Sequence, residues 1–199
     1  FPLLTSHKPH PTIPHSPTMN DNGHKRDSLY RVLTFPRRRS RGGASLVQFQ
    51  PGEGPDNALP FRIGKVLWTS GMNGEEQRGG HAHYETEEIL VCLRGACTVV
   101  LDDGKGAEDK VRLVEDLSPA PSNPARSDMR VVGNDSDSIN ALLLFPHVWR
   151  TLVGFAPDSQ FLIVANMEYD EADYIRDRAN FENFANAWCD LGGSCASLA

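Results

Sequence analysis

The amino-acid sequence predicts an all-β fold, either a sandwich or a small barrel, that ends in one short helix. Apolar segments of strand length recur along the chain, and clusters of Gly, Pro, Asp and Asn separate them. Only the C-terminal part shows apolar side chains at helical spacing. At 199 residues, the chain is long enough for one domain with a core of its own.

The composition excludes several classes of protein. The formal net charge is -6 and the isoelectric point is about 5.6, which argues against binding to nucleic acid or to an anionic membrane through bulk charge. No apolar run approaches the ~20 residues of a membrane span. The four cysteines show no Cys-x-x-Cys spacing, so we expect reduced thiols in a cytoplasmic protein.

We divide the chain into three parts. Residues 1–28 are rich in Pro, His, Ser and Thr without an apolar period, which predicts a disordered tail. Residues 29–170 are expected to form the β domain, and residues 171–199 a C-terminal helix and tail. Residues 105–138 are polar and contain prolines, so we expect a loop insertion or lid in which only residues 110–114 are strand-like.

Three strands are predicted in the N-terminal half of the β domain. The first covers residues 30–35 and ends at Pro36, and a basic turn follows at residues 37–43. This turn is either a solvated loop or a phosphate clamp, because guanidinium groups match phosphate oxygens. Residues 45–49 and 61–68 are the next two strands.

Further strands are predicted in the C-terminal half. Residues 88–93 and 96–101 are expected to form a β-hairpin around Arg94 and Gly95. Residues 139–145 and 160–167 are strongly apolar strands, and a shorter strand lies between them and ends at about Val153.

A helix is predicted to open at Asp170. Acidic side chains fill its first turn and arginines come later, as the helix dipole favours. Phe181, Phe184 and Trp188 recur at helical spacing, which indicates packing against the β domain rather than a ligand site.

The richest cluster of reactive side chains lies within residues 75–88. His81 and His83 are one residue apart, so in a strand both imidazoles would point to the same face. Arg78 precedes them, and Glu88 follows at the start of an apolar run. Proton-transfer sites and metal sites both need a cluster of this kind.

These residues resemble a known family. The spacing of His81, His83, Glu88 and Gly95 is similar to the first conserved motif of the cupins, which are double-stranded β-helix barrels of jelly-roll type. Within the cupins, the chain resembles the WxcM-like sugar 3,4-ketoisomerases from about residue 30 to residue 184. The segments that carry this resemblance are residues 78–83, 90–95, 100–104, 148–149, 169–176 and 180–181.

The resemblance implies a reaction and an assembly. Members of the family move the keto group of a dTDP-linked 4-keto-6-deoxyhexose from C4 to C3 without a cofactor, and they act as homodimers with exchanged strands. The resemblance implies His83 as the principal base and His81 as its partner. Imidazole suits this role, because one ring can remove a proton from C3 and another can deliver one to C4 through an enediol near neutral pH.

Five further residues are candidates for substrate binding. Arg78 is expected to stabilise the enediolate or to hold the diphosphate, and Arg41 is a further diphosphate candidate. Lys65, Trp68 and Arg150 occupy positions where the family usually has arginine, tyrosine and histidine, so they are expected to line an altered pocket.

Two alternatives stay open at this point. The isomerases tend to have glutamine where this chain has Glu88, so His81, His83 and Glu88 could form a face for Fe(II), Mn(II) or Zn(II). His147 could supply a fourth ligand only if its strand bends. Alternation along a strand places the side chains of residues 147 and 150 on opposite faces. The second alternative is a noncatalytic cupin that only binds a sugar nucleotide.

Overall fold

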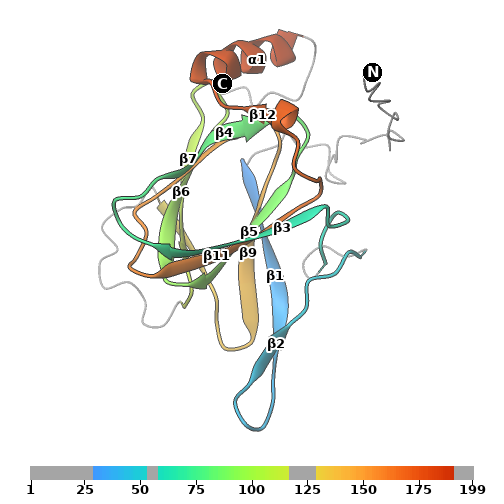
Figure 1. Cartoon of the computed structure of the whole chain (residues 1–199), viewed down its shortest axis with the longest axis vertical. Coiled ribbons are helices and arrows are strands. Elements are labelled where there is room, and N and C mark those ends of the chain that lie inside the picture. The colour runs from blue at the N-terminus through green and yellow to red at the C-terminus, as the bar shows by residue number, and fades with distance from the viewer. Residues whose placement is uncertain (1–28, 53–57, 117–128, 191–199) are drawn as a thin grey trace, which may run out of the picture.

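The computed structural model describes residues 29–52, 58–116 and 129–190. The predicted disordered tail at residues 1–28 lies outside these ranges. Two six-stranded sheets curl around a common core, and one helix closes the upper end of the barrel in Figure 1. The predicted all-β, jelly-roll barrel with a short C-terminal helix is therefore confirmed. No helix in the described ranges has the length and apolarity needed to cross a membrane.

The strands of the first sheet run in the order β2-β1-β9-β5-β11-β3. Their bounds in that order are Ser45–Val47, Tyr30–Arg39, Ser138–Leu144, Glu88–Arg94, Ser159–Ala165 and Lys65–Met72. The second sheet has the order β12-β4-β10-β6-β7-β8. Its bounds are Tyr174–Ile175, Arg78–His83, Trp149–Val153, Ala96–Asp102, Glu108–Val114 and Met129–Gly133. A 3₁₀ turn, η1 (Glu171–Asp173), precedes β12, and α1 (Arg178–Asp190) follows it.

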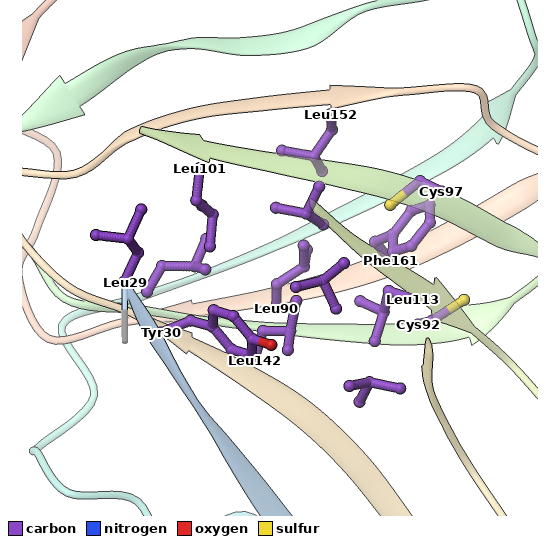
Figure 2. Close-up of a cluster of buried hydrophobic side chains, with 14 of the residues drawn as sticks. Leu29, Tyr30, Leu90, Cys92, Cys97, Leu101, Leu113, Leu142, Leu152 and Phe161 are labelled. Carbon is purple, nitrogen blue, oxygen red and sulfur yellow. The ribbon is translucent and has the colours of Figure 1, made fainter. Parts of the chain in front are cut away.

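The core lies between the two sheets. Figure 2 shows its buried side chains, which come from strands of both sheets and include Leu90, Leu101 and Phe161. Cys92 and Cys97 are buried in this cluster as free thiols. Burial raises the pKa of the Cys92 thiol to about 12, so this thiol stays protonated and unreactive.

The central strands of the first sheet are buried on both faces. In β5, Leu90 and Cys92 point into the barrel, whereas Ile89 and Val91 belong to a second apolar cluster. That cluster also contains Leu59, from the segment that follows β2. Burial on two sides explains why β5 is a continuous apolar run instead of an alternating one.

The predicted hairpin around Gly95 is wrong. β5 and β6 lie in different sheets, and Gly95 turns the chain from one sheet to the other with a φ of 77°. A Cβ at this position would lie 2.4 Å from Ser159 Oγ, so the corner requires glycine. β6 forms its hairpin with β7 instead, from the pair Ala96–Val114 to the pair Asp102–Glu108.

The first strand is longer than predicted. β1 passes through Pro36 to Arg39, and the turn is confined to residues 40–43. The Arg37 amide donates to Asp137 O on the β9 side at 2.7 Å, so position 36 faces the opposite edge. Pairing with β2 begins only at Arg37, so Pro36 interrupts no ladder hydrogen bond. β1 and β2 together form a ribbon that projects from the barrel in Figure 1.

The expected loop insertion at residues 105–138 contains two strands of the second sheet. β7 pairs with β6 along its whole length, and β8 pairs with β7 in parallel. β8 was missed because its residues Met129–Gly133 follow a long polar stretch and form a short edge strand. Residues 117–128, where the predicted lid would lie, are outside the described ranges.

The helix predicted from Asp170 begins later. Residues Glu171–Asp173 form a 3₁₀ turn, and Tyr174 and Ile175 then pair with the edge of β4 as β12. Hydrogen bonds to this sheet edge override the local helical signal, and α1 begins at Arg178. The predicted packing of the helix is confirmed, because Phe181 is fully buried against Ala82 and Ile175.

Candidate active site

Strand β4 carries both histidines and lies between β10 and β12. His81 is opposite Arg150 of β10, and His83 is opposite Tyr174 of β12. Gly79 permits the close approach of β4 to β10, because its φ is 76° and a Cβ there would lie 2.5 Å from the Arg150 carbonyl oxygen. The pairing of β10 with β4 shifts register beside this residue. The two imidazoles therefore sit on a strand that is held on both sides.

A cavity of about 150 Å³ opens in front of this strand. Its apolar wall comes from the two sheets and consists of Leu67, Leu90, Leu144, Leu152 and Ile163. Its polar wall consists of Arg78, His81, Glu88, Arg150 and Tyr174. An apolar pocket with a few convergent polar groups is the usual form of a small-molecule site.

His81 is the imidazole on the cavity wall. Its ring centroid lies 4.9 Å from that of His83, with the two planes at 82°. Burial, and then the positive charge of Arg150, lowers the His81 pKa from 6.5 to about 4. The ring is therefore neutral near pH 7 and able to accept a proton.

His83 is fully buried and, unlike His81, does not line the cavity. Its Nδ1 is 2.8 Å from Asp173 Oδ2, and its Nε2 is 3.6 Å from Glu88 Oε1. The Tyr174 ring packs against it at a centroid distance of 4.3 Å. Within the described residues, Nε2 has no hydrogen-bond partner. The ring is thus held at one nitrogen while the other stays unpaired.

Glu88 is an ionised carboxylate on the cavity wall. Burial alone would raise its pKa, but the contact with His83 and the charge of Arg150 outweigh burial and lower the pKa to about 2. The cavity therefore contains a fixed negative charge next to the imidazole pair.

Arg150 has a buried guanidinium group with unpaired hydrogen-bond donors. Its side chain is 1% exposed, and its Nη2 donates to Phe145 O at 2.9 Å. Its Nε and Nη1 have no hydrogen-bond partner among the described residues. Burial lowers the pKa of the guanidinium, and the nearby charge of Glu88 opposes that effect. A buried cation with unpaired donors is suited to bind a substrate oxygen that becomes negative.

The other predicted binding residues are only partly brought together. Arg78 lines the cavity, with its side chain 59% exposed and 3.6 Å from Glu76. Lys65 lies next to the site, because its Nζ is 3.4 Å from the Tyr174 hydroxyl. Trp68 is 69% exposed and does not line the cavity, whereas its neighbour Leu67 does.

Arg41 does not reach the cavity within one chain. It lies in the turn at the tip of the β1–β2 ribbon, which projects away from the end of the barrel that carries β4 and β12 (Figure 1). A diphosphate bound by Arg41 would have to lie in a different site, or in the cavity of a second copy of the chain.

Sequence reasoning missed Asp173, which it placed among the acidic side chains in the first turn of the predicted helix. Its side chain is buried and accepts hydrogen bonds from His83, from the Thr86 hydroxyl and from the Glu85 amide. Burial alone would raise the Asp173 pKa, but these three donors lower it to about 2. Only knowledge that β12 pairs with β4 could have identified Asp173 as a site residue, because this pairing brings residue 173 next to residue 83.

The predicted metal face is present as a set of side chains. The ligand atoms of His81, His83 and Glu88 all lie within 4.8 Å of one another. Arg150 lies beside them, and its positive charge opposes a divalent cation. His147 is not grouped with them, and its ring packs on Phe184 and Trp188 of α1 at 4.9 and 4.5 Å. The donor set therefore fits a metal poorly.

Comparison with known proteins gives consistent matches. The model of the FdtA family, described as WxcM-like, C-terminal, matches residues 29–116 and 125–186. A curated relative, the TDP-4-oxo-6-deoxy-alpha-D-glucose-3,4-oxoisomerase of Aneurinibacillus thermoaerophilus, is 34% identical over 145 residues. The match covers 73% of this chain and 84% of that protein.

Two crystal structures extend this comparison. A 3,4-ketoisomerase from Helicobacter canadensis has 25% identity and a TM-score of 0.61, and the match covers 79% of this chain and 97% of that one. The TDP-quinovose 3,4-ketoisomerase WlaRB from Campylobacter jejuni also has 25% identity, with a TM-score of 0.59 and coverage of 77% and 97%.

Proposed function

The chain belongs to the FdtA, or WxcM-like, family, and we propose that it is a ketoisomerase acting on a nucleotide-linked 4-keto-6-deoxyhexose. The keto group moves from C4 to C3, and thymidine diphosphate is the nucleotide. The name of the Aneurinibacillus relative gives a TDP-linked 4-oxo-6-deoxyglucose as its substrate and a 3,4-oxoisomerisation as its reaction. The observation that carries the proposal is the pair of imidazoles next to one buried guanidinium at a small cavity.

The reaction conserves every atom of the sugar. The C3–H proton passes to an imidazole, the C3–H electron pair forms the C3=C4 double bond, and O4 takes the negative charge. The O3–H proton then leaves as the C3=O3 bond forms, and one proton is added at C4 and one at O4. Positioned proton transfer of this kind typically contributes ~10²–10⁴-fold to the rate.

His81 and His83 share the proton transfer in this proposal. His83 keeps the predicted role of principal base, because Asp173 occupies Nδ1 and leaves Nε2 unpaired. His81 is neutral and lines the cavity, and its ring lies 4.9 Å from that of His83, so it links the sugar to the buried ring. Both imidazoles are required if the proton passes along the pair.

Arg150 stabilises the enediolate in this scheme. Its unpaired Nε and Nη1 are buried donors on a residue that lines the cavity, and Glu88 balances its charge between turnovers. Arg78 and Lys65, at the more exposed side, are the proposed contacts of the diphosphate.

NMR of the sugar during incubation with TDP-4-keto-6-deoxyglucose tests the proposal. We expect signals of a 3-keto-6-deoxyhexose, and we expect His81→Asn and His83→Asn each to lower kcat by ~10²–10⁴-fold. Either variant turning over at the wild-type rate would remove that residue from the mechanism. Binding of the nucleotide sugar without turnover by the wild type would instead favour a noncatalytic cupin.

A metal-dependent cupin enzyme is the second candidate, because three ligand atoms lie within 4.8 Å of one another. Titration of Fe(II), Mn(II) and Zn(II) into metal-free protein separates the two candidates. We expect no uptake near one equivalent, because Arg150 opposes a divalent charge. Tight uptake that is lost in Glu88→Gln would favour the metal enzyme.

We also propose that the protein is a cytoplasmic homodimer. Strand β3 is the edge of its sheet and exposes Val66, Leu67 and Trp68 by 55%, 41% and 69%. An exposed apolar edge strand is a surface that a partner usually covers. The cytoplasmic location rests on the cysteine pattern and stays a prediction.

A further inference from the structure

We propose that Asp173 is the positioning residue of the imidazole pair: it holds His83 with its proton on Nδ1, so that Nε2 is the atom that accepts a proton. The inference rests on the proposed isomerase function and names a residue that this function requires. It follows from the hydrogen bonds of Asp173 and from the part of the chain that supplies it.

The carboxylate of Asp173 has three donors around it. Oδ1 accepts from the Glu85 amide at 2.7 Å, and Oδ2 accepts from the Thr86 hydroxyl at 2.5 Å. Nδ1 of His83 lies 2.8 Å from the same Oδ2. An ionised carboxylate only accepts hydrogen bonds, so the ring nitrogen that faces it must carry a proton. In neutral His83, the lone pair is therefore on Nε2.

Nε2 of His83 is the unpaired nitrogen, and it lies near a residue of the cavity wall. Nε2 lies 3.6 Å from Glu88 Oε1, and Glu88 lines the cavity. No described residue hydrogen-bonds to Nε2, although it is buried. A buried acceptor without a partner costs stability, which is typical of a group kept for function.

The chain topology fixes Asp173 and His83 to each other. η1 and β12 add to the edge of β4, with Tyr174 opposite His83. The Tyr84 amide also donates to the Asp173 backbone carbonyl at 3.0 Å. Hydrogen bonds on both backbone and side chain leave little freedom to the pair, so the C-terminal segment that covers β4 also orients the histidine on it.

The variant Asp173→Asn tests this role sharply. The Glu85 amide is a fixed donor, so the asparagine must keep its oxygen at the Oδ1 position and place its NH₂ group at the Oδ2 position. The NH₂ group then donates to Nδ1 of His83, and the ring proton moves to Nε2. The shape of the site is preserved, while the accepting nitrogen is lost.

Long-range ¹H–¹⁵N NMR of the imidazole rings, with His83→Asn used for assignment, reports which nitrogen carries the proton. We expect the proton on Nδ1 of His83 in the wild type and on Nε2 in Asp173→Asn. We expect kcat of Asp173→Asn to fall by ~10²–10⁴-fold with KM within about threefold, because substrate binding does not use Asp173. A wild-type proton on Nε2, or an Asp173→Asn kcat near that of the wild type, would overturn the inference.

Asp177→Asn is the matched control. Asp177 lies in the same segment, and its Oδ1 accepts from the Asn180 amide at the start of α1, a role that asparagine also fills. We expect this variant to keep the wild-type tautomer and kcat. If the wild type fails to isomerise the sugar, the proposed function fails, while the ring NMR of the wild type still tests Asp173 by itself.

Discussion

Arg150 sets the charge of the cavity at the scale of single residues. Its guanidinium is buried and lines the cavity, and its charge lowers the pKa of both His81 and Glu88. Together with the burial of His81 and the contact between His83 and Glu88, this charge favours a neutral imidazole and an ionised carboxylate. The resemblance to the family drew attention to this position, but only the structure gives its burial and its unpaired nitrogens.

We predict that Arg150→Lys lowers kcat by ~10²–10³-fold, because lysine keeps the charge but cannot place two donors as guanidinium does. Steady-state kinetics with the nucleotide sugar measure this loss. Arg78→Lys, at an exposed position, is the control and should raise KM with a smaller change in kcat. Equal effects of the two substitutions on kcat would remove Arg150 from the transition state.

We predict that the protein loses stability as the pH falls from about 6.5. The His81 pKa is lowered from 6.5 to about 4, so between these values the unfolded chain binds a proton that the folded chain does not. Folding therefore becomes less favourable by about 3 kcal/mol over this window. Glu88 adds a further loss at lower pH, from its ordinary 4.5 down to about 2.

Urea denaturation at a series of pH values measures this slope. His81→Gln should reduce the slope between pH 6.5 and pH 4 by up to one proton, because glutamine does not titrate. An unchanged slope in His81→Gln would show that the ring is not buried in its neutral form.

Strand β4 carries both histidines of the site, and Gly79 allows it to approach β10 closely. Gly79 and Gly80 both have positive φ, 76° and 69°, so alanine is strained at either position. Only at position 79 would a Cβ meet backbone, 2.5 Å from the Arg150 carbonyl oxygen. At position 80, the nearest atom is the end of the Gln77 side chain at 4.0 Å.

We therefore predict that Gly79→Ala destabilises the fold more than Gly80→Ala, by about 2 kcal/mol or more. The shift of β10 away from β4 should also lower kcat, because Arg150 would move. Urea midpoints and kinetics of the two variants measure both effects. If Gly80→Ala is as damaging as Gly79→Ala, the close approach of β4 to β10 does not matter.

The positions of the strands were predicted better than the pairing between them. The apolar runs at residues 88–93 and 139–145 located β5 and β9 to within a residue, because burial on one or both faces leaves a strong local signal. The sequence does not show which strand lies next to which. The hairpin around Gly95 was therefore wrong, although the glycine was a correct sign of a sharp turn.

In the site, too, residues near one another in sequence were predicted, and a residue that depends on strand pairing was missed. His81, His83 and Glu88 were predicted together because they are near in sequence and because the two histidines share a strand face. Asp173 was missed because it lies 90 residues from His83 and reaches it only through the pairing of β12 with β4. Contacts of this range depend on tertiary packing, which local patterns do not encode.

At the scale of the whole molecule, edge strand β3 exposes three consecutive apolar side chains, Val66, Leu67 and Trp68. We predict that Val66→Glu turns the proposed homodimer into a monomer, because a charge would be buried at the interface of two apolar edges. Sedimentation equilibrium of the two proteins measures this change. Val131→Glu is the control, since Val131 is 37% exposed on β8 at the edge of the other sheet. A monomeric wild type, or dissociation in Val131→Glu alone, would contradict this dimer.

The most direct test of the whole account is the rate at which metal-stripped protein converts TDP-4-keto-6-deoxyglucose in the presence of chelator. Acid–base isomerisation by His81 and His83 predicts full wild-type conversion to the 3-keto sugar. The double variant His81→Asn/His83→Asn should convert the sugar at least ~10²-fold more slowly. No conversion by the wild type, recovery only after metal is added, or unchanged conversion by the double variant would contradict the account.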